Sequence, residues 1–260
     1  MPTAQEDWPT LAEILKFRDN VRARLQAVYD DIAAGKMAMS RRVGRMLFMT
    51  YEHEAMHAET LLYMLVQSPL TRAPSAVALP EWPSLATRWN QEAAKNPNKV
   101  LFIPGGKVQI GHHDLEAEDA QYPDEKGWEK HEFGWDIEHP NVTTEVRDFK
   151  VDSLVVTNDD YLSYLQATGA DLDDVNALPA SWVRDQGEWK VRSLYGPLSF
   201  DIAGKWPLMA SKLEIEAFAK WKGGRLPTEA ELRLLWENEQ GPRPDGLLAN
   251  VGFKHWHPVP

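Results

Sequence analysis

Two histidines four residues apart are the clearest chemical signal in this sequence. They lie in the segment YEHEAMHAE at 51–59, as His53 and His57. On a helix this spacing places both imidazoles on one face, one turn apart, so that both can reach a single ion. Neutral imidazole suits iron, zinc, copper and nickel, and two ligands leave most of the coordination sphere for other groups. The pair therefore predicts a metal site but does not name the metal.

The same pair has two other interpretations. One is structural, with both imidazoles on a partly buried helix face. That face also carries Met46, Thr50 and Met64. The other is a zinc peptidase of the HExxH type, with Glu54 as general base and a third ligand on a following helix or loop. Because Glu59 lies only two residues on and Glu81 sits among prolines, the sequence disfavours the peptidase.

The remaining candidate ligands are weaker. His255 and His257 have strand spacing and could chelate, but their terminal segment favours surface packing. His112 and His113 open an acidic loop, where calcium is conceivable. The acidic residues of that loop are Asp114, Glu116, Glu118, Asp119, Asp124 and Glu125. Because they lack regular ligand spacing, we expect a solvated loop.

The histidine pair is carried by a predicted helix from about Ser40 to Gln67. An earlier helix is predicted over 10–34, where apolar residues recur at steps of three and four. Thr10 and Glu13 fit a capping box at its start, and Gly35 closes it. We expect the two helices to pack as an antiparallel hairpin. Because two helices bury only part of a bundle, its other partners must come from elsewhere in the chain, another subunit, or sequence absent here.

The segment 69–97 holds five prolines and no sustained periodicity, so it reads as a surface linker. From residue 98 the signals change to short strands and helices. The pattern predicts two hairpins, one of 100–103 with 107–110 around Pro-Gly-Gly, the other of 182–184 with 189–191. It also predicts helices over 159–167, 211–221 and 228–237. The fold class is α+β, with domains 1–68 and 98–260.

Composition excludes several functions. The 260 residues hold 28 Lys and Arg against 39 Asp and Glu, and the net charge of −11 would repel nucleic acid and anionic membranes. The chain has no cysteine, so disulfides, thiolate metal sites and cysteine nucleophiles are excluded. No apolar run approaches the ~20 residues of a membrane span, and the start of the chain is polar. We expect a soluble, cytoplasmic protein.

Four segments together carry a family resemblance. GGRLPTEAE at 223–231 is similar to the signature of formylglycine-generating-enzyme or sulfatase-modifying-factor domains. FGWDIEHP at 133–140 and VVTNDDY at 155–161 match the earlier part of that domain. The HExxHxE helix at 53–59 is similar to the DinB-like bundle of ergothioneine-biosynthesis sulfoxide synthases. The combination resembles that synthase family.

Two further stretches, 191–211 and 250–260, resemble the fungal-type form of the synthase. The resemblance implies a partial DinB-like helical domain followed by a C-type-lectin-like sulfatase-modifying-factor domain. It further implies a non-haem iron(II) enzyme that uses oxygen to join the sulfur of cysteine or γ-glutamylcysteine to hercynine, giving a sulfoxide. His53 and His57 carry over as two of the family's three histidine ligands to Fe(2+).

The sequence also departs from the family pattern. The third histidine belongs to an earlier helix, and no histidine precedes His53 in this chain. The family domain continues past Pro260, so the chain looks truncated at both ends, and no catalytic residue is assigned. Ile137 stands where the family usually has Asn. The alternative is an inactive paralogue or fragment that acts as a binding or scaffold protein. We also expect self-association through an exposed bundle face.

Overall fold

The polypeptide folds into two units, and the boundary between them falls within its second helix. A computed structural model describes residues 8–68, 70–73, 75–121, 131–174, 178–238, 255, 257 and 258. The first unit comprises the chain up to His53 together with Gly111–Pro140, and the second comprises Glu54–Ile110 and the chain from Asn141 onward. The division falls within one helix. It differs from the predicted domains, whose bounds remain a prediction.

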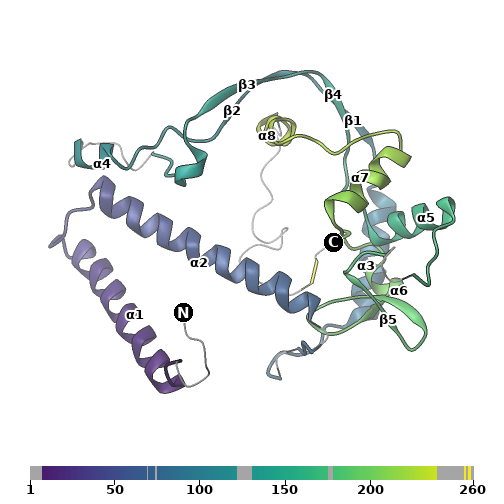
Figure 1. Cartoon of the computed structure of the whole chain (residues 1–260), viewed down its shortest axis with the longest axis horizontal. Coiled ribbons are helices and arrows are strands. Elements are labelled where there is room, and N and C mark those ends of the chain that lie inside the picture. Colours follow the sequence, from purple (N-terminus) through teal and green to yellow (C-terminus); the bar gives the residue numbers. More distant parts are fainter. Residues whose placement is uncertain are drawn as a thin grey trace. The chain divides into compact units, whose positions relative to one another are not determined.

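The structure mixes helices with small antiparallel sheets, which confirms the α+β class (Figure 1). The helices are α1 Leu11–Ala33, α2 Arg41–Gln67, α3 Trp82–Lys95, α4 Glu118–Gln121, η3 Asp136–Glu138, α5 Asn158–Thr168, α6 Phe200–Ala203, α7 Lys212–Trp221 and α8 Glu229–Asn238. The strands are β1 Val100–Ile103, β2 Gly106–Ile110, β3 Val142–Val146, β4 Phe149–Asp152, β5 Trp182–Asp185, β6 Glu188–Val191 and β7 Leu198–Ser199. A DinB-like bundle remains a prediction.

Helix α1 begins where its capping box predicted. The Thr10 hydroxyl accepts from the Glu13 amide at 3.3 Å, and the Glu13 carboxylate accepts from the Thr10 amide at 2.8 Å. The expected close packing of α1 in a hairpin is not observed, since α1 contains no buried residue and Phe17 is 71% exposed. Its apolar stripe is only partly covered by the described residues, at Leu25, Val28 and Ile32, whereas a stripe of this width is normally closed by several helices.

The strands at 100–110 lie where predicted, but their predicted pairing is wrong. β1 pairs with β4 and β2 pairs with β3, both antiparallel, so the chain does not turn back at Pro104-Gly105. The pairs Ile103–Phe149 and Gly106–Val146 belong to one continuous register. Between them the Gly105 amide donates to the Asp148 carboxylate at 2.7 Å, which replaces a ladder bond. A Cβ at Gly105 would lie 2.6 Å from the Val146 carbonyl oxygen, so close approach of the backbone, not a turn, requires this glycine.

The hairpin of β5 and β6 is confirmed. Trp182 pairs with Val191 and Asp185 with Glu188, and β7 extends the sheet beside β6. The turn consists of Gln186 at φ 53° and Gly187 at φ 87°. Two successive residues with positive φ are typical of a two-residue turn whose twist matches antiparallel strands.

The core of the second unit is aromatic. Its main cluster joins Trp89 of α3, Tyr161 of α5, Trp182 of β5, Phe218 of α7 and Trp206. The remaining buried members are Ala86, Leu165, Leu178, Val191, Leu198 and Ala203. A smaller cluster packs α8 on the β-ribbon through Ile103, Val108, Val146, Ala230 and Leu234.

Helix α3 corrects the predicted linker. The range 69–97 was expected to be irregular and on the surface, yet α3 occupies 82–95 and buries Ala86 and Trp89. Proline misled the prediction here, because Pro83 lies in the first turn of α3, where no intrahelical amide bond is lost.

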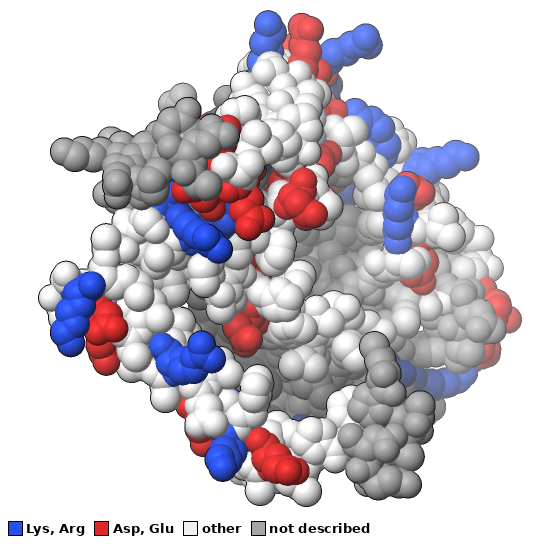
Figure 2. Space-filling model, turned by 60° about the vertical axis from the view of Figure 1, so that its left-hand side comes forward, with Lys and Arg blue, Asp and Glu red and all other residues white. Residues whose placement is uncertain are grey.

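Charge is distributed without a basic patch on the face shown in Figure 2, where Lys and Arg side chains lie among Asp and Glu. This agrees with the net charge of −11. No helix among the described residues is long and apolar enough to cross a membrane.

Candidate functional site

The histidine pair lies on α2, as predicted, with both side chains in exposed positions of the helix. All eight histidines of the sequence fall within the described part of the chain. There, no cluster of three or more histidine or carboxylate side chains could hold a metal ion. The described residues therefore add no third ligand beside His53 and His57, and a metal site at this pair remains a prediction.

An aromatic side chain from outside α2 lies beside the first histidine. The ring of Trp135 has its centroid 6.2 Å from that of His53, with 48° between the ring planes. Trp135 is partly buried and directly precedes η3. Its amide donates to the Glu138 carboxylate at 2.8 Å, which fixes the backbone at the start of η3. Ile137, which departs from the family pattern, is 87% exposed.

The segment that carries Trp135 is bound to the loop before it through Asp114. The Asp114 carboxylate accepts from the Gly134 amide at 3.0 Å and lies 2.7 Å from the His131 Nε2. Gly134 itself packs tightly, since a Cβ there would lie 2.8 Å from the His112 ring. The position thus requires glycine for close approach.

Asp114 and Asp119 form a buried ion cluster with two arginines of α2. Arg45 donates to both carboxylates, at 2.6 Å from its Nε to Asp119 and 2.6 Å from its Nη2 to Asp114. Arg41 lies 3.3 Å from Asp114 and 3.1 Å from Asp119. The side chains of Arg41, Asp114 and Asp119 are each at most 4% exposed. The expected solvated loop is therefore wrong at these two aspartates, and their charges are matched by arginine instead of calcium or water.

The cluster shifts the acidity of its members. Burial by itself would raise the pKa of Asp114, but hydrogen bonds from Arg45, the Gly134 amide and His131 hold that pKa well below its usual range. Hydrogen bonds to Asp119 and Asp114 raise the pKa of Arg45 further. Asp114 thus serves as an anionic acceptor, which suits it to hold a loop and not to transfer protons.

Phenylalanine completes the cluster on its apolar side. The Arg45 guanidinium lies 5.1 Å from the centroid of the buried Phe133 ring, and Phe48 of α2 lies 5.9 Å from it. Sequence reasoning missed the two arginines. A signal was present, because Arg41 and Arg45 are one turn apart on a helix face, as His53 and His57 are. Nothing in the local sequence pointed to partners more than sixty residues away.

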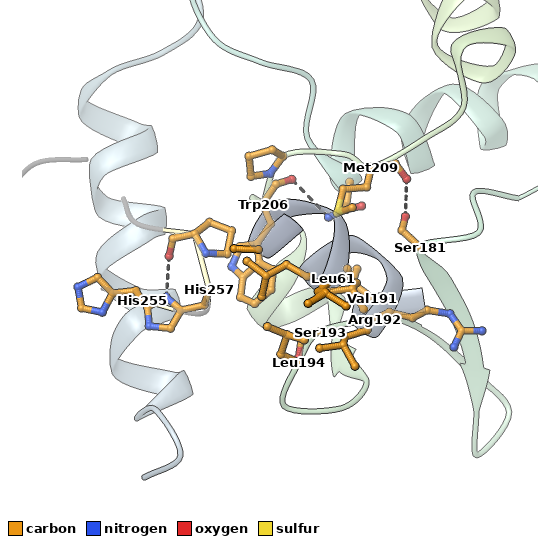
Figure 3. Close-up of a pocket in the computed structure, with 17 residues that line it drawn as sticks. Leu61, Ser181, Val191, Arg192, Ser193, Leu194, Trp206, Met209, His255 and His257 are labelled. Atoms are coloured by element: carbon orange, nitrogen blue, oxygen red, sulfur yellow. Dashed lines mark hydrogen bonds between the residues drawn. The ribbon is translucent and has the colours of Figure 1, made fainter. Parts of the chain in front are cut away.

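The second unit contains a cavity of about 630 Å³ beside the last turns of α2 (Figure 3). Leu61 and Leu65 of α2 line it together with Val191, Leu194 and Trp206. Asn158 also lines the cavity. It is 1% exposed and holds the backbone there by donating to the carbonyl oxygens of Ala203 and Trp206. The Trp182 indole donates back to Asn158 at 2.8 Å. The lining is mostly apolar.

The two C-terminal histidines lie at this cavity, not beside His53 and His57 on α2. His255 and His257 have ring centroids 5.3 Å apart. His257 packs edge-on against Trp82 and Trp89 of α3, at 5.6 and 5.9 Å, and its Nδ1 lies 2.7 Å from the Pro258 carbonyl oxygen. The packing role expected for this pair fits these contacts.

Comparison with known protein families shows to which family the chain belongs. The sulfatase-modifying factor enzyme 1-like domain matches residues 86–235, more than half of the sequence. The chain belongs to this family. The match begins within α3 and ends within α8, so it includes both hydrophobic clusters, the ribbon and the β5–β7 sheet.

Three relatives align over most of this chain, and two of them share a name. Ergothioneine biosynthesis protein 1 of Neurospora crassa is 32% identical over 89% of this chain and 28% of that protein. The Schizosaccharomyces pombe protein of the same name is 27% identical over 83% of this chain and 28% of its own length. Hercynine oxygenase of Mycolicibacterium smegmatis is 26% identical over 80% of this chain and 48% of its own. The resemblance found from the sequence motifs is confirmed, and the chain spans less than half the length of these relatives.

Proposed function

We propose that this chain functions in ergothioneine biosynthesis as part of an iron- and oxygen-dependent sulfoxide synthase. The observation that carries the proposal is the coincidence of two features in one chain. Residues 86–235 match the sulfatase-modifying-factor domain, and relatives named for ergothioneine biosynthesis and hercynine oxygenation align over at least 80% of the chain. The helix that carries His53 and His57 precedes the matched domain.

In this proposal His53 and His57 supply two ligands to Fe(2+). The fit rests on their chemistry and spacing, since both are exposed imidazoles one turn apart on a long, regular helix. Bound iron would supply oxygen activation and would acidify a coordinated thiol. The third ligand is not among the described residues.

The substrates we propose are hercynine, oxygen and a cysteine-type thiol, either cysteine or γ-glutamylcysteine. Hercynine is named in one relative, and the thiol and oxygen follow from the family resemblance. Formylglycine generation, the other activity associated with this domain type, is disfavoured because the chain has no cysteine to perform it. The proposed location is cytoplasmic.

A second candidate function is non-catalytic binding or scaffolding. The observation that favours it is that only two adjacent ligands are found in the described part of the chain. A two-histidine site binds metal more weakly than a complete site and leaves its chemistry to groups from elsewhere.

Anaerobic metal binding separates the two functions. The purified chain is equilibrated with Fe(2+), and bound iron is compared between wild type, His53→Ala and the matched control His255→Ala. The synthase proposal expects iron bound by wild type and the control but lost from His53→Ala, with oxygen consumed when hercynine and a thiol are added. Iron at background level in all three, without oxygen consumption, would support the scaffold.

A further inference from the structure

A short segment of the first unit lies against α2 just before the histidine pair. Phe133 contacts Phe48 and Arg45, and Trp135 contacts His53, so alternate residues of the segment meet successive turns of α2. Phe133 is 8% exposed, whereas Trp135 is only partly buried. The buried Phe133 ring therefore anchors the segment on α2, and the Trp135 side chain extends from the segment toward the His53 imidazole.

One carboxylate ties this segment to the helix. Asp114 accepts from the Gly134 amide at 3.0 Å, between the two aromatic residues, and from Arg45 of α2 at 2.6 Å. The same carboxylate therefore bonds both the segment and the helix face it lies on. The Glu138 bond to the Trp135 amide fixes the following residue in turn. Hydrogen bonds from the Trp135 amide and from the preceding amide thus fix the backbone from which the Trp135 side chain extends toward α2.

We propose that Trp135 is a positioning residue for the His53 imidazole, held in place by Asp114 and Arg45. This inference rests on the proposed function, in which His53 is a metal ligand. The mechanism is restriction of the His53 ring. An imidazole on an exposed helix face samples several rotamers, and a large aromatic ring against one side removes some of them before metal arrives.

The expected effect on metal affinity is modest. Partners that hydrogen-bond to a ligand histidine change affinity by about 10- to 100-fold. Trp135 makes a ring contact at 6.2 Å and not a hydrogen bond to the imidazole. We therefore expect its removal to weaken binding by about three- to tenfold, below that range.

The first test needs no metal. In proton–carbon NMR spectra of the full chain, the His53 ring resonance is identified by its absence in His53→Ala. The Trp135 ring current should shift that resonance, and Trp135→Leu should abolish the shift. Trp221→Leu is the matched control, because Trp221 is a 48% exposed tryptophan on α7 of the second unit. A His53 resonance identical in wild type and Trp135→Leu would overturn the proposal.

The second test measures affinity with Co²⁺ alone, a divalent metal that imidazole binds well. Trp135→Leu and Asp114→Asn should each weaken Co²⁺ binding by about three- to tenfold, while Trp221→Leu leaves it unchanged. If Asp114→Asn fails to fold, Trp135→Leu alone decides, because its side chain is only partly buried.

The results distinguish the positioning role of Trp135 from the metal-ligand role of His53 on which it rests. Binding lost in His53→Ala but unchanged in Trp135→Leu overturns the positioning role and leaves the metal role of His53 intact. Binding that is absent from wild type, or equal in wild type and His53→Ala, removes the metal role and overturns the positioning role with it. A ring shift and an affinity loss confined to Trp135→Leu and Asp114→Asn support both.

Discussion

The two units bury their side chains by different means. The second unit packs indole and phenyl rings, such as Trp182 against Phe200 at 4.9 Å and Trp89 against Trp206 at 5.6 Å. The first unit instead buries Arg41 of α2 with Asp114 and Asp119, beside the partly buried Arg45, while α1 contains no buried residue. Apolar packing is non-directional and adds over area, whereas a buried ion cluster holds one geometry and is costly to break. We therefore expect the ion cluster of the first unit mainly to position residues 131–138, and the aromatic core of the second unit mainly to stabilise its fold.

The largest expected effect comes from removing a ring of the aromatic core. Trp182 is 3% exposed, and its indole donates to Asn158. Trp182→Ala should lower the free energy of unfolding of the second unit by about 3–5 kcal/mol, since it leaves a cavity and an unpaired buried acceptor. Urea unfolding followed by circular dichroism measures this. Trp221→Ala on the exposed side of α7 is the control, and equal losses in the two variants would contradict an aromatic core centred on Trp182.

Breaking the ion cluster should cost somewhat less. Asp114→Asn keeps the volume but removes the charge that faces Arg45, and we expect a loss of about 2–4 kcal/mol confined to the first unit. Amide hydrogen exchange of 131–138 against 158–168 shows where the loss occurs. Asp148→Asn is the matched control, since Asp148 is exposed on the ribbon and accepts from the Gly105 amide without a facing arginine among the described residues.

The same carboxylate gives the cluster a pH dependence. Because the pKa of Asp114 is lowered in the folded chain, its contribution is fully present above the ordinary value of about 3.9 and is lost as pH falls below it. Wild type should therefore lose protection of 131–138 on acidification, and Asp114→Asn should show a flatter profile. Identical profiles below pH 4 would assign the acid sensitivity to other groups.

A smaller effect is expected at the start of α8. Hydrogen bonds from Arg225 lower the pKa of Glu231 to about 2, and the same carboxylate accepts from the Thr228 amide at 2.7 Å. This cap stabilises α8 above the ordinary glutamate pKa of about 4.3 and is lost as pH falls toward 2. Glu231→Gln should cost about 1 kcal/mol near neutral pH, as a lost cap does, measured by urea unfolding. Glu229→Gln, in the same first turn, is the control.

The sequence predicted the features that depend on local interactions and missed those that depend on residues far away in the chain. The capping box at Thr10, the helix predicted over 211–221 and the hairpin of 182–184 with 189–191 depend on neighbours within a few residues, and the structure has all of them. The prediction of a hairpin at Pro104-Gly105 was wrong. Gly105 is required because the backbone of a partner strand more than forty residues later approaches it closely, and the sequence does not distinguish such a glycine from a turn glycine.

The candidate site divides in the same way. The spacing of His53 and His57 can be read from the helix itself, so the pair was found. Arg41 and Arg45 have an equally regular spacing, but their role depends on carboxylates in a loop about seventy residues later. The contact of Trp135 with His53 is of the same long-range kind, and no local pattern predicts it.

The smallest effect on stability should come from the exposed stripe of α1, where self-association was predicted. Phe17 is 71% exposed, so Phe17→Ser should change the free energy of unfolding by less than about 0.5 kcal/mol. If the stripe joins two copies of the chain, the same variant should shift sedimentation velocity toward the monomer, because an exposed apolar patch associates by burial of its area. Arg24→Ser, a polar position of the same helix, serves as control. A loss above about 2 kcal/mol for Phe17→Ser would show that this ring is buried in solution, and the contrast between an exposed α1 and a packed second unit would then fail.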